Sequence, residues 1–392
     1  MKLLVVGLGQ CGGRLADEFA RMNGRARSHR NMTIVTGAFA INSDTADLSC
    51  LTTIPKDPKH RILIGGYKTS GHGVGKVNEL GAEIARMDVD KIINAIRNTK
   101  HFFETDAFLL MAGAAGGTGS GAISVVAQYL KERYIDKPVY TLVVLPFEHE
   151  ESTEERTVYN VATCLKSCNS IADAVILVDN QRYVRKDSSV KNNLTKINSM
   201  IAAPFYNLLC AGEEKKSKYI GAKIIDAGDI IHTMAKWTAI GYGKVETPVF
   251  KWPNEWGKDF RKKGIETHRG IQAMDEAISE LSLECNPADA RRAIYIVSGP
   301  SKEMNMDMIK EIGEHTREIV PDAIIRNGDY PRERGLVDVT IVLSELSVVK
   351  KVKDYYFTST FLVPEVEKRQ EETRDKLRKL DDASKSIPSL LQ

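Results

Sequence analysis

The fold is decided by the stretch Gly113-Ala114-Ala115-Gly116-Gly117-Thr118-Gly119-Ser120-Gly121. Residues 107–112 before it are apolar and predict a buried strand, and residues 122–130 after it predict a helix. Glycine permits positive φ angles and close approach of a ligand, so we expect a Cβ atom at Gly117 to block the ligand's approach. The free N–H groups and the dipole at a helix start favour an anion. With hydroxyls from Thr118 and Ser120, the stretch predicts a phosphate-binding turn.

Length and composition indicate a soluble protein of two domains. The chain has 392 residues, of which 42% are hydrophobic and 27% are charged, and a chain of this length usually exceeds one core. Its net charge of +3 argues against nucleic acid as a partner, because nucleic-acid-binding proteins usually carry a basic excess. No apolar run reaches membrane-spanning length, and the N-terminal one is too short for a signal peptide. We therefore expect a cytoplasmic protein without membrane insertion.

The six cysteines indicate a reducing compartment. They are scattered along the chain and form no Cys-x-x-Cys pair, so the sequence predicts no metal site of its own. Cys164 and Cys168 are four residues apart in a segment of helical apolar spacing, so we expect both to face the core.

A second glycine-rich turn follows the first predicted strand, residues 3–6. Gly7-Leu8-Gly9-Gln10-Cys11-Gly12-Gly13 leads from this strand into a helix predicted over about residues 14–22. The pattern Gly7-x-Gly9-x-x-Gly12 matches the dinucleotide-binding fingerprint, which also requires an acidic residue at the end of the second strand. The second predicted strand ends in Asn42-Ser43-Asp44, so the sequence does not decide whether this requirement for an acidic residue is met. An NAD-dependent dehydrogenase is therefore one alternative.

The stretch from Gly113 to Gly121 fits neither a Walker A loop, which ends in Lys-Ser or Lys-Thr, nor the dinucleotide fingerprint. It resembles the signature loop of the tubulin and FtsZ superfamily, Gly-Gly-Gly-Thr-Gly-Ser-Gly, with Ala115 at the first position. Three other segments, at residues 9–12, 42–44 and 71–75, resemble the other phosphate-side loops of that superfamily. The resemblance implies a nucleotide bound by Gly9, Gln10, Cys11, Gly12, Asn42, Asp44, Gly71, Gly73, Gly75, Gly113, Ala114, Ala115, Gly116, Gly117, Thr118, Gly119 and Ser120.

The segment after the pair Pro146-Phe147 resembles the ribose-binding segment of FtsZ proteins, in which a glutamate and an arginine hold the sugar. The candidates for the glutamate are Glu150 and Glu151, and the candidate for the arginine is Arg156. The alternative for the glutamates is an acidic helix start that the helix dipole favours.

The resemblance also implies that two asparagines, Asn180 and Asn198, recognise the guanine base. Val178-Asp179-Asn180 is similar to the tubulin loop whose asparagine reads guanine, and an asparagine offers both donors and an acceptor to a purine edge. A helix predicted over about residues 188–209 places Asn198 where the superfamily has its second guanine-reading residue. Leu194 stands where the superfamily often has an aromatic residue that stacks on the base, so we expect aliphatic packing there.

Asp226 and Asp229 begin a predicted helix and resemble the catalytic loop of FtsZ, Asn-x-Asp-x-x-Asp. Ile224 stands at the asparagine position, which is a departure from that pattern. The resemblance implies that both aspartates act on the GTP of the next subunit in a filament. The alternative is that they are ordinary N-terminal helix residues that cap it and favour its dipole.

Pro248 to Gly264 reads as a loop with Phe250, Trp252, Trp256 and Phe260, which suggests an interface or domain packing. The last segment, about residues 363–385, is highly charged with a helical pattern and has no apolar face wide enough for a membrane anchor.

Taken together, the sequence is most similar to the archaeal CetZ branch of the superfamily. This implies a doubly wound, mostly parallel α/β sheet in a GTPase domain (residues 1–187), a long central helix (188–211), a smaller α+β domain (212–362) and a charged helical tail (363–392). It implies a cytoskeletal GTPase for cell shape or division that binds GTP or GDP with Mg²⁺, has Asp44 as an outer-sphere partner of the ion, assembles with copies of itself and offers its tail to an adaptor. The alternatives are a filament or adaptor protein with little hydrolysis, and the dehydrogenase.

Overall fold

The computed structural model describes residues 1–184, 190–246, 259–333 and 335–385. Its ten described strands form one sheet in the order β3-β2-β1-β4-β5-β6-β7-β10-β8-β9. Pairs from β3 to β7 are parallel, β10 is antiparallel to both of its neighbours, and β8 is parallel to β9. The strands are β1 (Leu3–Leu8), β2 (Val35–Asn42), β3 (Arg61–Leu63), β4 (Ala107–Gly113), β5 (Val139–Leu145), β6 (Ala174–Asp179), β7 (Lys236–Glu246), β8 (Arg292–Gly299), β9 (Ile324–Pro331) and β10 (Leu336–Ser344).

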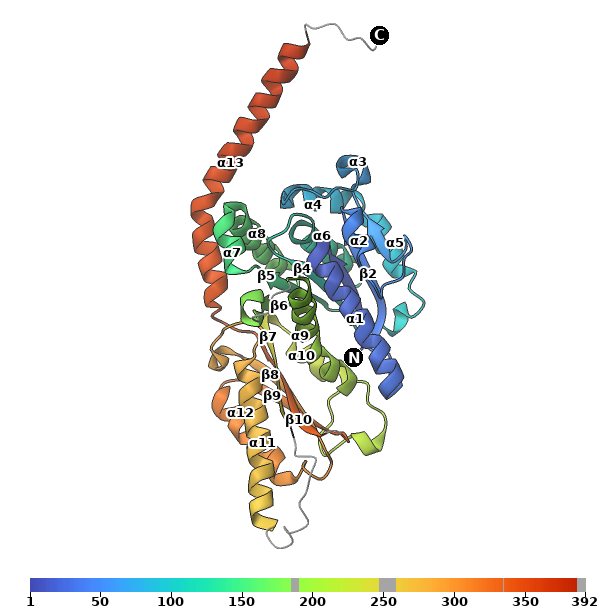
Figure 1. Cartoon of the computed structure of the whole chain (residues 1–392), viewed down its shortest axis with the longest axis vertical. Coiled ribbons are helices and arrows are strands. Elements are labelled where there is room, and N and C mark those ends of the chain that lie inside the picture. Colours follow the sequence, from blue (N-terminus) through green and yellow to red (C-terminus); the bar gives the residue numbers. More distant parts are fainter. Residues whose placement is uncertain (185–189, 247–258, 334, 386–392) are drawn as a thin grey trace.

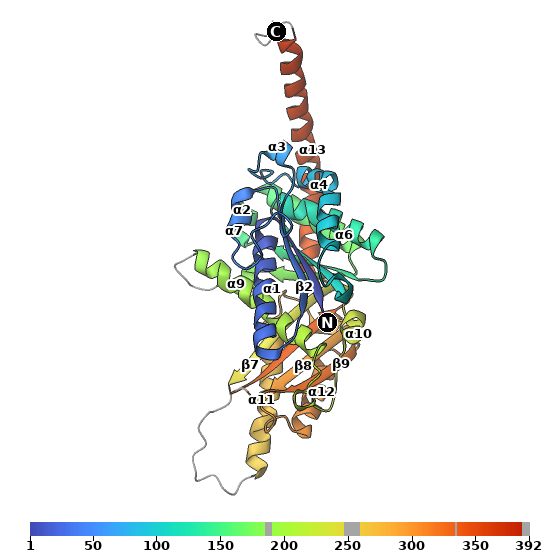
Figure 2. The same ribbon diagram turned by 90° about the vertical axis from the view of Figure 1, so that its right-hand side faces the viewer.

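Helices cover both faces of the parallel part of the sheet (Figures 1 and 2). The helices are α1 (Gly9–Arg30), α2 (Thr45–Ser49), α3 (Gly66–Thr69), α4 (Asn78–Met87), α5 (Val89–Arg97), α6 (Thr118–Arg133), α7 (Glu148–Thr153), α8 (Glu155–Ile171), α9 (Val190–Ala211), α10 (Ala227–Thr233), α11 (Asp259–Ser279), α12 (Met306–Ile319) and α13 (Lys350–Ser384). No helix in the described ranges is long and apolar enough to cross a membrane.

Strand β1 shows why the sheet has two covered faces. All six of its residues are buried. Leu3 and Val5 belong to the core that α1 and α9 cover, whereas Leu4 and Val6 belong to the core on the side of α4, α6 and α8. A strand buried on both faces reads as a continuous apolar run, as parallel strands do. The predicted doubly wound sheet is thereby confirmed, and Cys164 is buried in the second core as expected.

Strand β7 joins the parallel part of the sheet to the second half, and the sequence interpretation did not predict it. Lys236 to Thr238 pair with β6, and the strand then pairs along β10. A Cβ atom at Gly241 or Gly243 would collide with backbone carbonyls of α11. These glycines therefore permit a helix to pack closely on the strand.

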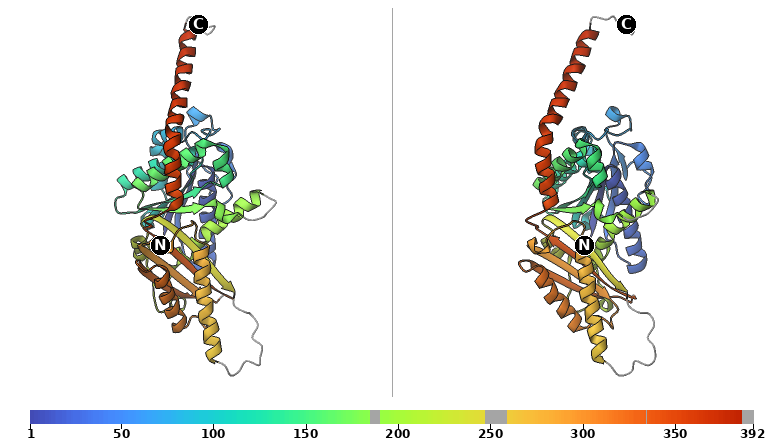
Figure 3. Two further views of the ribbon diagram at one scale, coloured as in Figure 1. Left: turned by 90° about the vertical axis from the view of Figure 1, so that its left-hand side faces the viewer. Right: turned by 60° about the vertical axis from the view of Figure 1, so that its left-hand side comes forward.

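Four helix boundaries differ from the sequence prediction. Helix α11 begins at Asp259, inside the segment from Pro248 to Gly264 that was predicted to be a loop. Helix α1 begins at Gly9, inside the glycine turn, rather than near residue 14. Apolar spacing over residues 76–97 predicts one helix, but the chain forms α4 and α5 with a break at Asp88. Helix α13 begins at Lys350 rather than 363, because its first turns bury Val352 and Tyr355 against the body before the charged part extends away (Figure 3).

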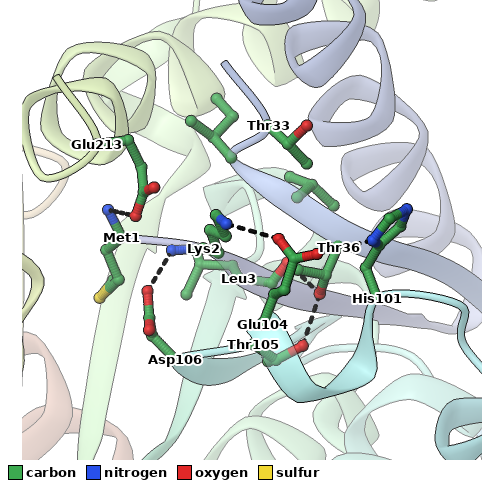
Figure 4. A network of polar contacts seen from close by, with 12 residues as sticks. Met1, Lys2, Leu3, Thr33, Thr36, His101, Glu104, Thr105, Asp106 and Glu213 are labelled. Atoms are coloured by element: carbon green, nitrogen blue, oxygen red, sulfur yellow. Dashed lines mark hydrogen bonds and ion pairs between the residues drawn. The ribbon is translucent and has the colours of Figure 1, made fainter. Parts of the chain in front are cut away.

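The amino end of β1 is fastened to the end of α9 by polar contacts (Figure 4). The Met1 amine donates to the carbonyl of Leu209 at 3.1 Å and pairs with Glu213 at 3.0 Å. The next N–H, of Lys2, donates to Asp106 at 2.7 Å. Strand β1 therefore links the junction with the second half, at its amino end, to the first glycine turn, at its carboxyl end.

Candidate functional site

Two glycine turns lie side by side at the carboxyl ends of β1 and β4. The chain passes from β1 to β2 on one side of β1, whereas β4 lies on its other side, so this is the point where the strand order reverses. Ligands of open α/β sheets bind at such a point. Both strands lead into helices, α1 and α6, whose starts have no side-chain cap. The N–H groups of their first turns are therefore available to an anion.

Glycines allow the starts of α1 and α6 to touch. Gly9 has a φ of +70°, and a Cβ atom there would lie 2.9 Å from the backbone nitrogen of Gly119. A Cβ atom on Gly119 would lie 2.6 Å from the carbonyl oxygen of Leu8. Two helix dipoles therefore converge on one place, which favours a strongly negative ligand such as a polyphosphate.

A pocket of about 330 Å³ opens at this place. Its volume lies within the range of ~300–1,000 Å³ that is usual for ligand sites. Other hollows among the described residues are larger, including one of 510 Å³ beside Tyr206, so chemistry rather than size singles this pocket out. The predicted residues that line it are Gly9, Gln10, Cys11, Asn42, Asp44, Gly73, Gly113, Ala115, Gly116, Gly117, Thr118, Gly119, Glu150 and Asn180.

Asp47 lines the pocket and was missed by the sequence interpretation. Its carboxylate accepts a hydrogen bond from Gln10 Nε2 at 2.7 Å and another from Asn42 Nδ2 at 2.9 Å. It thus connects two predicted nucleotide loops. Asp44 accepts from the backbone N–H groups of Ala46 and Asp47 and caps α2 while its side chain lines the same pocket. The only sequence signal for Asp47 was its place one helical turn after Asp44.

The two hydroxyls of the signature stretch have different surroundings. Thr118 lines the pocket, and its hydroxyl lies 2.6 Å from that of buried Ser43. Ser120 is not a lining residue; its hydroxyl donates to the carbonyls of Gly116 and Gly117 and holds the turn. Ser43 is a further residue that the sequence interpretation left out of the site.

The third glycine loop is folded against the second. Gly71 and Gly73 both have a φ of +80°, and Gly75 has one of +56°. The N–H of Thr45 donates to the carbonyl of Gly71 at 3.0 Å, and the N–H of Gly73 donates to that of Ser43 at 3.1 Å. Gly73 lines the pocket, whereas Gly71 and Gly75 shape the loop behind it.

Gly117 is needed for a reason other than the expected one. A Cβ atom there would lie 2.5 Å from the side chain of Val74 and 2.9 Å from the backbone of Lys76. The third loop, and not a ligand, therefore excludes a side chain at Gly117, which corrects the expectation. At Gly116 a Cβ atom would meet no protein atom within 4 Å. Gly116 is thus the position where a side chain would enter open space at the pocket.

Gly12 and Ala114 lie beneath the pocket rather than on its wall. A Cβ atom on Gly12 would collide with the carbonyl of Met111, so this glycine permits α1 to lie against β4. Ala114 is fully buried, and its N–H donates to the carbonyl of Val144 at 2.9 Å.

Of the residues predicted for the ribose, Glu150 alone lines the pocket. Its carboxylate accepts from the N–H of Phe147 at 2.9 Å. The carboxylate of Glu151 instead accepts from the Tyr355 hydroxyl. Arg156 pairs with Glu79 and donates to the carbonyl of Lys76, just after the third loop, at 3.1 Å. Only Glu150 of the three therefore lies at the pocket, and the ribose-binding roles of Glu150, Glu151 and Arg156 remain predictions.

Of the two predicted base-reading residues, Asn180 lines the pocket and Asn198 does not. Asn180 follows β6 directly, and Asp179 fixes this turn by accepting from the N–H of Gln181 at 3.0 Å. Asn198 and Leu194 lie on α9 and are half-buried. The base contact predicted for Asn198 remains a prediction.

Asp226 and Asp229 cap α10 and lie far from the pocket of their own chain. Asp226 Oδ1 accepts from the N–H of Asp229 at 2.8 Å, and Asp229 Oδ1 pairs with Arg326 at 3.1 Å. A Cβ atom on Gly212 would lie 2.6 Å from the Met1 amine and 3.5 Å from the start of α10, which places α10 at the amino end of β1. The pocket is at the carboxyl end of this six-residue strand, and such a strand spans about 20 Å.

The aromatic residues Phe250, Trp252 and Trp256 lie outside the described residues, as does the side chain of Phe260. Their predicted role at an interface remains a prediction.

The charged side chains that line the pocket are mostly acidic. Asp44, Asp47 and Glu150 face a single cation, Lys76, which pairs with Glu154 at 2.7 Å. Among the described residues no group of three or more His, Cys, Asp or Glu side chains is placed to hold a metal ion. A triphosphate would therefore need a divalent cation that it carries itself, held mostly by phosphate and water as Mg²⁺ prefers.

Cys11 should be chemically inert although it lines the pocket. Burial raises the pKa of its thiol to about 12, so the thiol stays protonated below that pH, and a thiol is a poor nucleophile. At pH 8, iodoacetamide should modify exposed Cys50 well before Cys11. Peptide mass spectrometry over time measures the two rates. Equal rates would show that Cys11 is more accessible and more acidic than its burial implies.

Comparison with known proteins identifies the family. Residues 2–186 match the Tubulin/FtsZ family, GTPase domain, and residues 187–359 match the Tubulin-like CetZ, C-terminal domain. The chain belongs to the tubulin/FtsZ family, in its CetZ branch. It is 33% identical over 370 residues to the tubulin-like protein CetZ1 of Haloferax volcanii, with 90% of each chain covered. It is 28% identical over 387 residues to CetZ of Pyrococcus abyssi, with 97% of this chain and 95% of the other covered.

Solved structures of CetZ proteins have the same fold. The GDP-bound monomer of CetZ1 from H. volcanii superposes with a TM-score of 0.77 at 31% identity, covering 92% of this chain and 99% of the other. The GTPγS-bound protofilament of CetZ2 from the same organism gives 0.79 at 26% identity, covering 94% and 100%. Membership of the CetZ branch confirms the resemblance inferred from the loops. It argues against the alternative of an NAD-dependent dehydrogenase.

Proposed function

We propose that this CetZ protein binds GTP with Mg²⁺, assembles head to tail with copies of itself, and hydrolyses GTP only at the contact between subunits. One observation carries the proposal: the pocket and the aspartates Asp226 and Asp229 lie at opposite ends of β1, about 20 Å apart. Neither aspartate reaches the pocket of its own chain, but a head-to-tail contact brings α10 of one subunit to the pocket of the next.

The pocket fits a nucleoside triphosphate at three places. In this proposal the N–H groups of two uncapped helix starts bind the phosphates, Glu150 binds the sugar and Asn180 reads the base. Both side chains line the pocket, which supports these roles. The related CetZ2 protein forms a GTPγS-bound protofilament. When bound, Mg²⁺ would neutralise phosphate charge, with Asp44 within reach of its water shell.

Asp226 is the better placed of the two aspartates to orient water. It is exposed, and its Oδ1 is occupied by capping, whereas its Oδ2 makes no hydrogen bond to the described part of the chain. Asp229 is held on both sides, by Asp226 and by Arg326. Asp229 therefore fixes the position of the loop, and Asp226 offers a free carboxylate oxygen to a water near the γ-phosphate of the neighbour.

A filament protein with little hydrolysis is the second candidate, and Ile224 favours it. This side chain is 62% exposed at the position where FtsZ has an asparagine. It presents no polar atom to the neighbouring nucleotide, whereas the FtsZ pattern has an amide at this position.

Assembly tests the proposal directly. Sedimentation and negative-stain electron microscopy should show filaments with GTP or GTPγS and Mg²⁺, and few with GDP. Filaments that form equally without nucleotide would contradict the link between the pocket and the contact. In the cell we expect such filaments in the cytoplasm, acting in shape or division, with the projecting part of α13 available to an adaptor.

Asn180→Ala should weaken GTP binding about tenfold and reduce the preference for GTP over ATP. The change leaves purine groups unpaired in a partly desolvated pocket, which costs ~1–3 kcal/mol. Titration with fluorescent GTP and ATP analogues measures both effects. Asn198→Ala is the companion variant, and a similar loss there would establish the contact that remains a prediction. Unchanged selectivity in both variants would exclude the assignment of the base.

A further inference from the structure

The first turns of α13 reach two loops of the nucleotide pocket from outside. Val352 and Tyr355 bury their side chains in the body, and the helix runs along α8 (Figures 1 and 3). This end of α13 is therefore a fixed part of the core, although the far end of the helix projects away from it. Residues on it can hold neighbouring loops in place.

Lys351 of α13 pairs with the loop on the base side. Its Nζ lies 2.7 Å from Asp179 Oδ2, and the Asp179 side chain is only 9% exposed. The other oxygen of Asp179 accepts from the N–H of Gln181. Asn180, which lines the pocket, lies between Asp179 and Gln181 in the chain. The ion pair therefore fixes the backbone that carries the proposed base-reading side chain.

Tyr355 of α13 holds the loop on the ribose side. Its hydroxyl donates to the carboxylate of Glu151, the residue that follows Glu150 of the pocket. Burial and the neighbouring carboxylate raise the pKa of Tyr355, so the hydroxyl keeps the proton that it donates. None of the six residues of α7 is buried. The position of this short helix therefore depends on polar contacts such as this one.

We propose that Lys351 and Tyr355 are positioning residues through which the C-terminal helix sets the affinity and base selectivity of the nucleotide pocket. Neither residue lines the pocket. Each acts through the residue next to a lining residue: Asp179 beside Asn180, and Glu151 beside Glu150. The proposal rests on the proposed GTP function and adds to it a control element at the start of the helix whose projecting end an adaptor would bind.

Coupling of this kind is reciprocal. If α13 orders the two loops for the nucleotide, bound nucleotide must in turn restrain the first turns of α13. A partner that moves this end of the helix would then change nucleotide affinity, and GTP would change the affinity for that partner by the same factor.

Three variants of the full-length chain test the proposal. Lys351→Met should weaken GTP binding about tenfold, because it leaves the Asp179 carboxylate buried without its cation. It should also reduce the ratio of the affinity for GTP to the affinity for ATP. Tyr355→Phe keeps the buried ring and removes one hydroxyl, so it should weaken GTP and ATP by an equal factor of about three. Lys351→Arg restores a cation and should bind GTP within about twofold of the parent.

Lys353→Met is the matched control, because this lysine is exposed on the same helix and its side chain has no ion pair in the described part of the chain. It should bind GTP and ATP as the parent does. Thermal unfolding is measured for all variants, and hydrogen exchange of residues 350–356 should slow when GTP is added to the parent. If the Lys351→Met protein does not fold, the GTP affinity of the Tyr355→Phe protein tests the proposal instead.

The proposal is overturned if folded Lys351→Met and Tyr355→Phe proteins match the parent in GTP affinity and in selectivity. It is also overturned if Lys353→Met loses as much affinity as Lys351→Met, since the effect would then belong to the helix as a whole. A parent protein that binds no guanine nucleotide would instead refute the proposed function. The two failures are therefore distinguishable.

Discussion

Asp229→Asn should bind GTP like the parent protein but lose about a hundredfold in GTP turnover, because the Asp226 carboxylate is no longer held in place and a misplacement of ~1 Å can cost ~100-fold. Its own pocket is unchanged, because the aspartate lies at the opposite end of β1. The change removes the carboxylate that pairs with Arg326 and holds the Asp226 loop. Unhydrolysed GTP should then keep subunits assembled. Phosphate release, GTP titration and sedimentation measure the three quantities.

A different result is expected if the aspartates only cap α10. Loss of a helix cap costs about 1 kcal/mol of stability and leaves turnover of the folded protein unchanged. Asn305→Ala supplies that reference, because Asn305 caps α12 through the N–H of Met308 at 2.8 Å and belongs to no proposed site. If the Asp229→Asn protein hydrolyses GTP as fast as the Asn305→Ala protein, helix capping is the sole role of Asp229.

Mixing variants tests whether the aspartates act on another subunit. Asp229→Asn keeps a sound pocket, and a variant with a blocked pocket keeps sound aspartates. Neither should hydrolyse GTP alone. Together they should recover part of the parent turnover wherever a sound pocket meets sound aspartates. A mixture as inactive as its components would contradict catalysis between subunits.

Gly116→Val should abolish detectable GTP binding while the protein keeps the unfolding temperature of the parent. A Cβ atom at this position meets no protein atom, so the added side chain is accommodated and enters open space at the pocket wall. Gly117→Val should also lose binding, but with a clear loss of stability, because its Cβ atom collides with Val74 and the third loop. Overpacking of this kind costs about 1–3 kcal/mol.

Calorimetry and GTP titration on both variants separate these two causes. Gly116→Val that is stable and binds GTP like the parent would show that the phosphates do not lie against this turn. Gly117→Val that is as stable as the parent would show that the third loop can move aside.

The glycine-rich loops were predictable from the sequence because their residue types are required by local backbone geometry. Gly9 and Gly73 have positive φ angles, and the starts of α1 and α6 follow directly from strand-turn-helix patterns. The buried strands before these turns followed from apolar runs in the same way. These features depend on neighbours along the chain, which the sequence displays.

Features that depend on distant neighbours were missed or misread. Asp47 belongs to the pocket only because Gln10 and Asn42 approach it. Strand β7 was not predicted, because nothing in the nearby sequence shows that α11 packs against its glycines, Gly241 and Gly243. Likewise, Glu150 and Glu151 look alike in sequence, and only the structure shows that Glu150 lines the pocket while Glu151 accepts from Tyr355, more than two hundred residues later.

The measurement that tests the central claim most directly is GTP turnover per subunit as a function of protein concentration. A site completed by a second molecule should show very low turnover at low concentration and a rise towards a constant value once filaments form. The onset of turnover should coincide with assembly followed by light scattering in the same samples. Turnover per subunit that is the same at all concentrations, below and above assembly, would contradict hydrolysis at the contact between subunits.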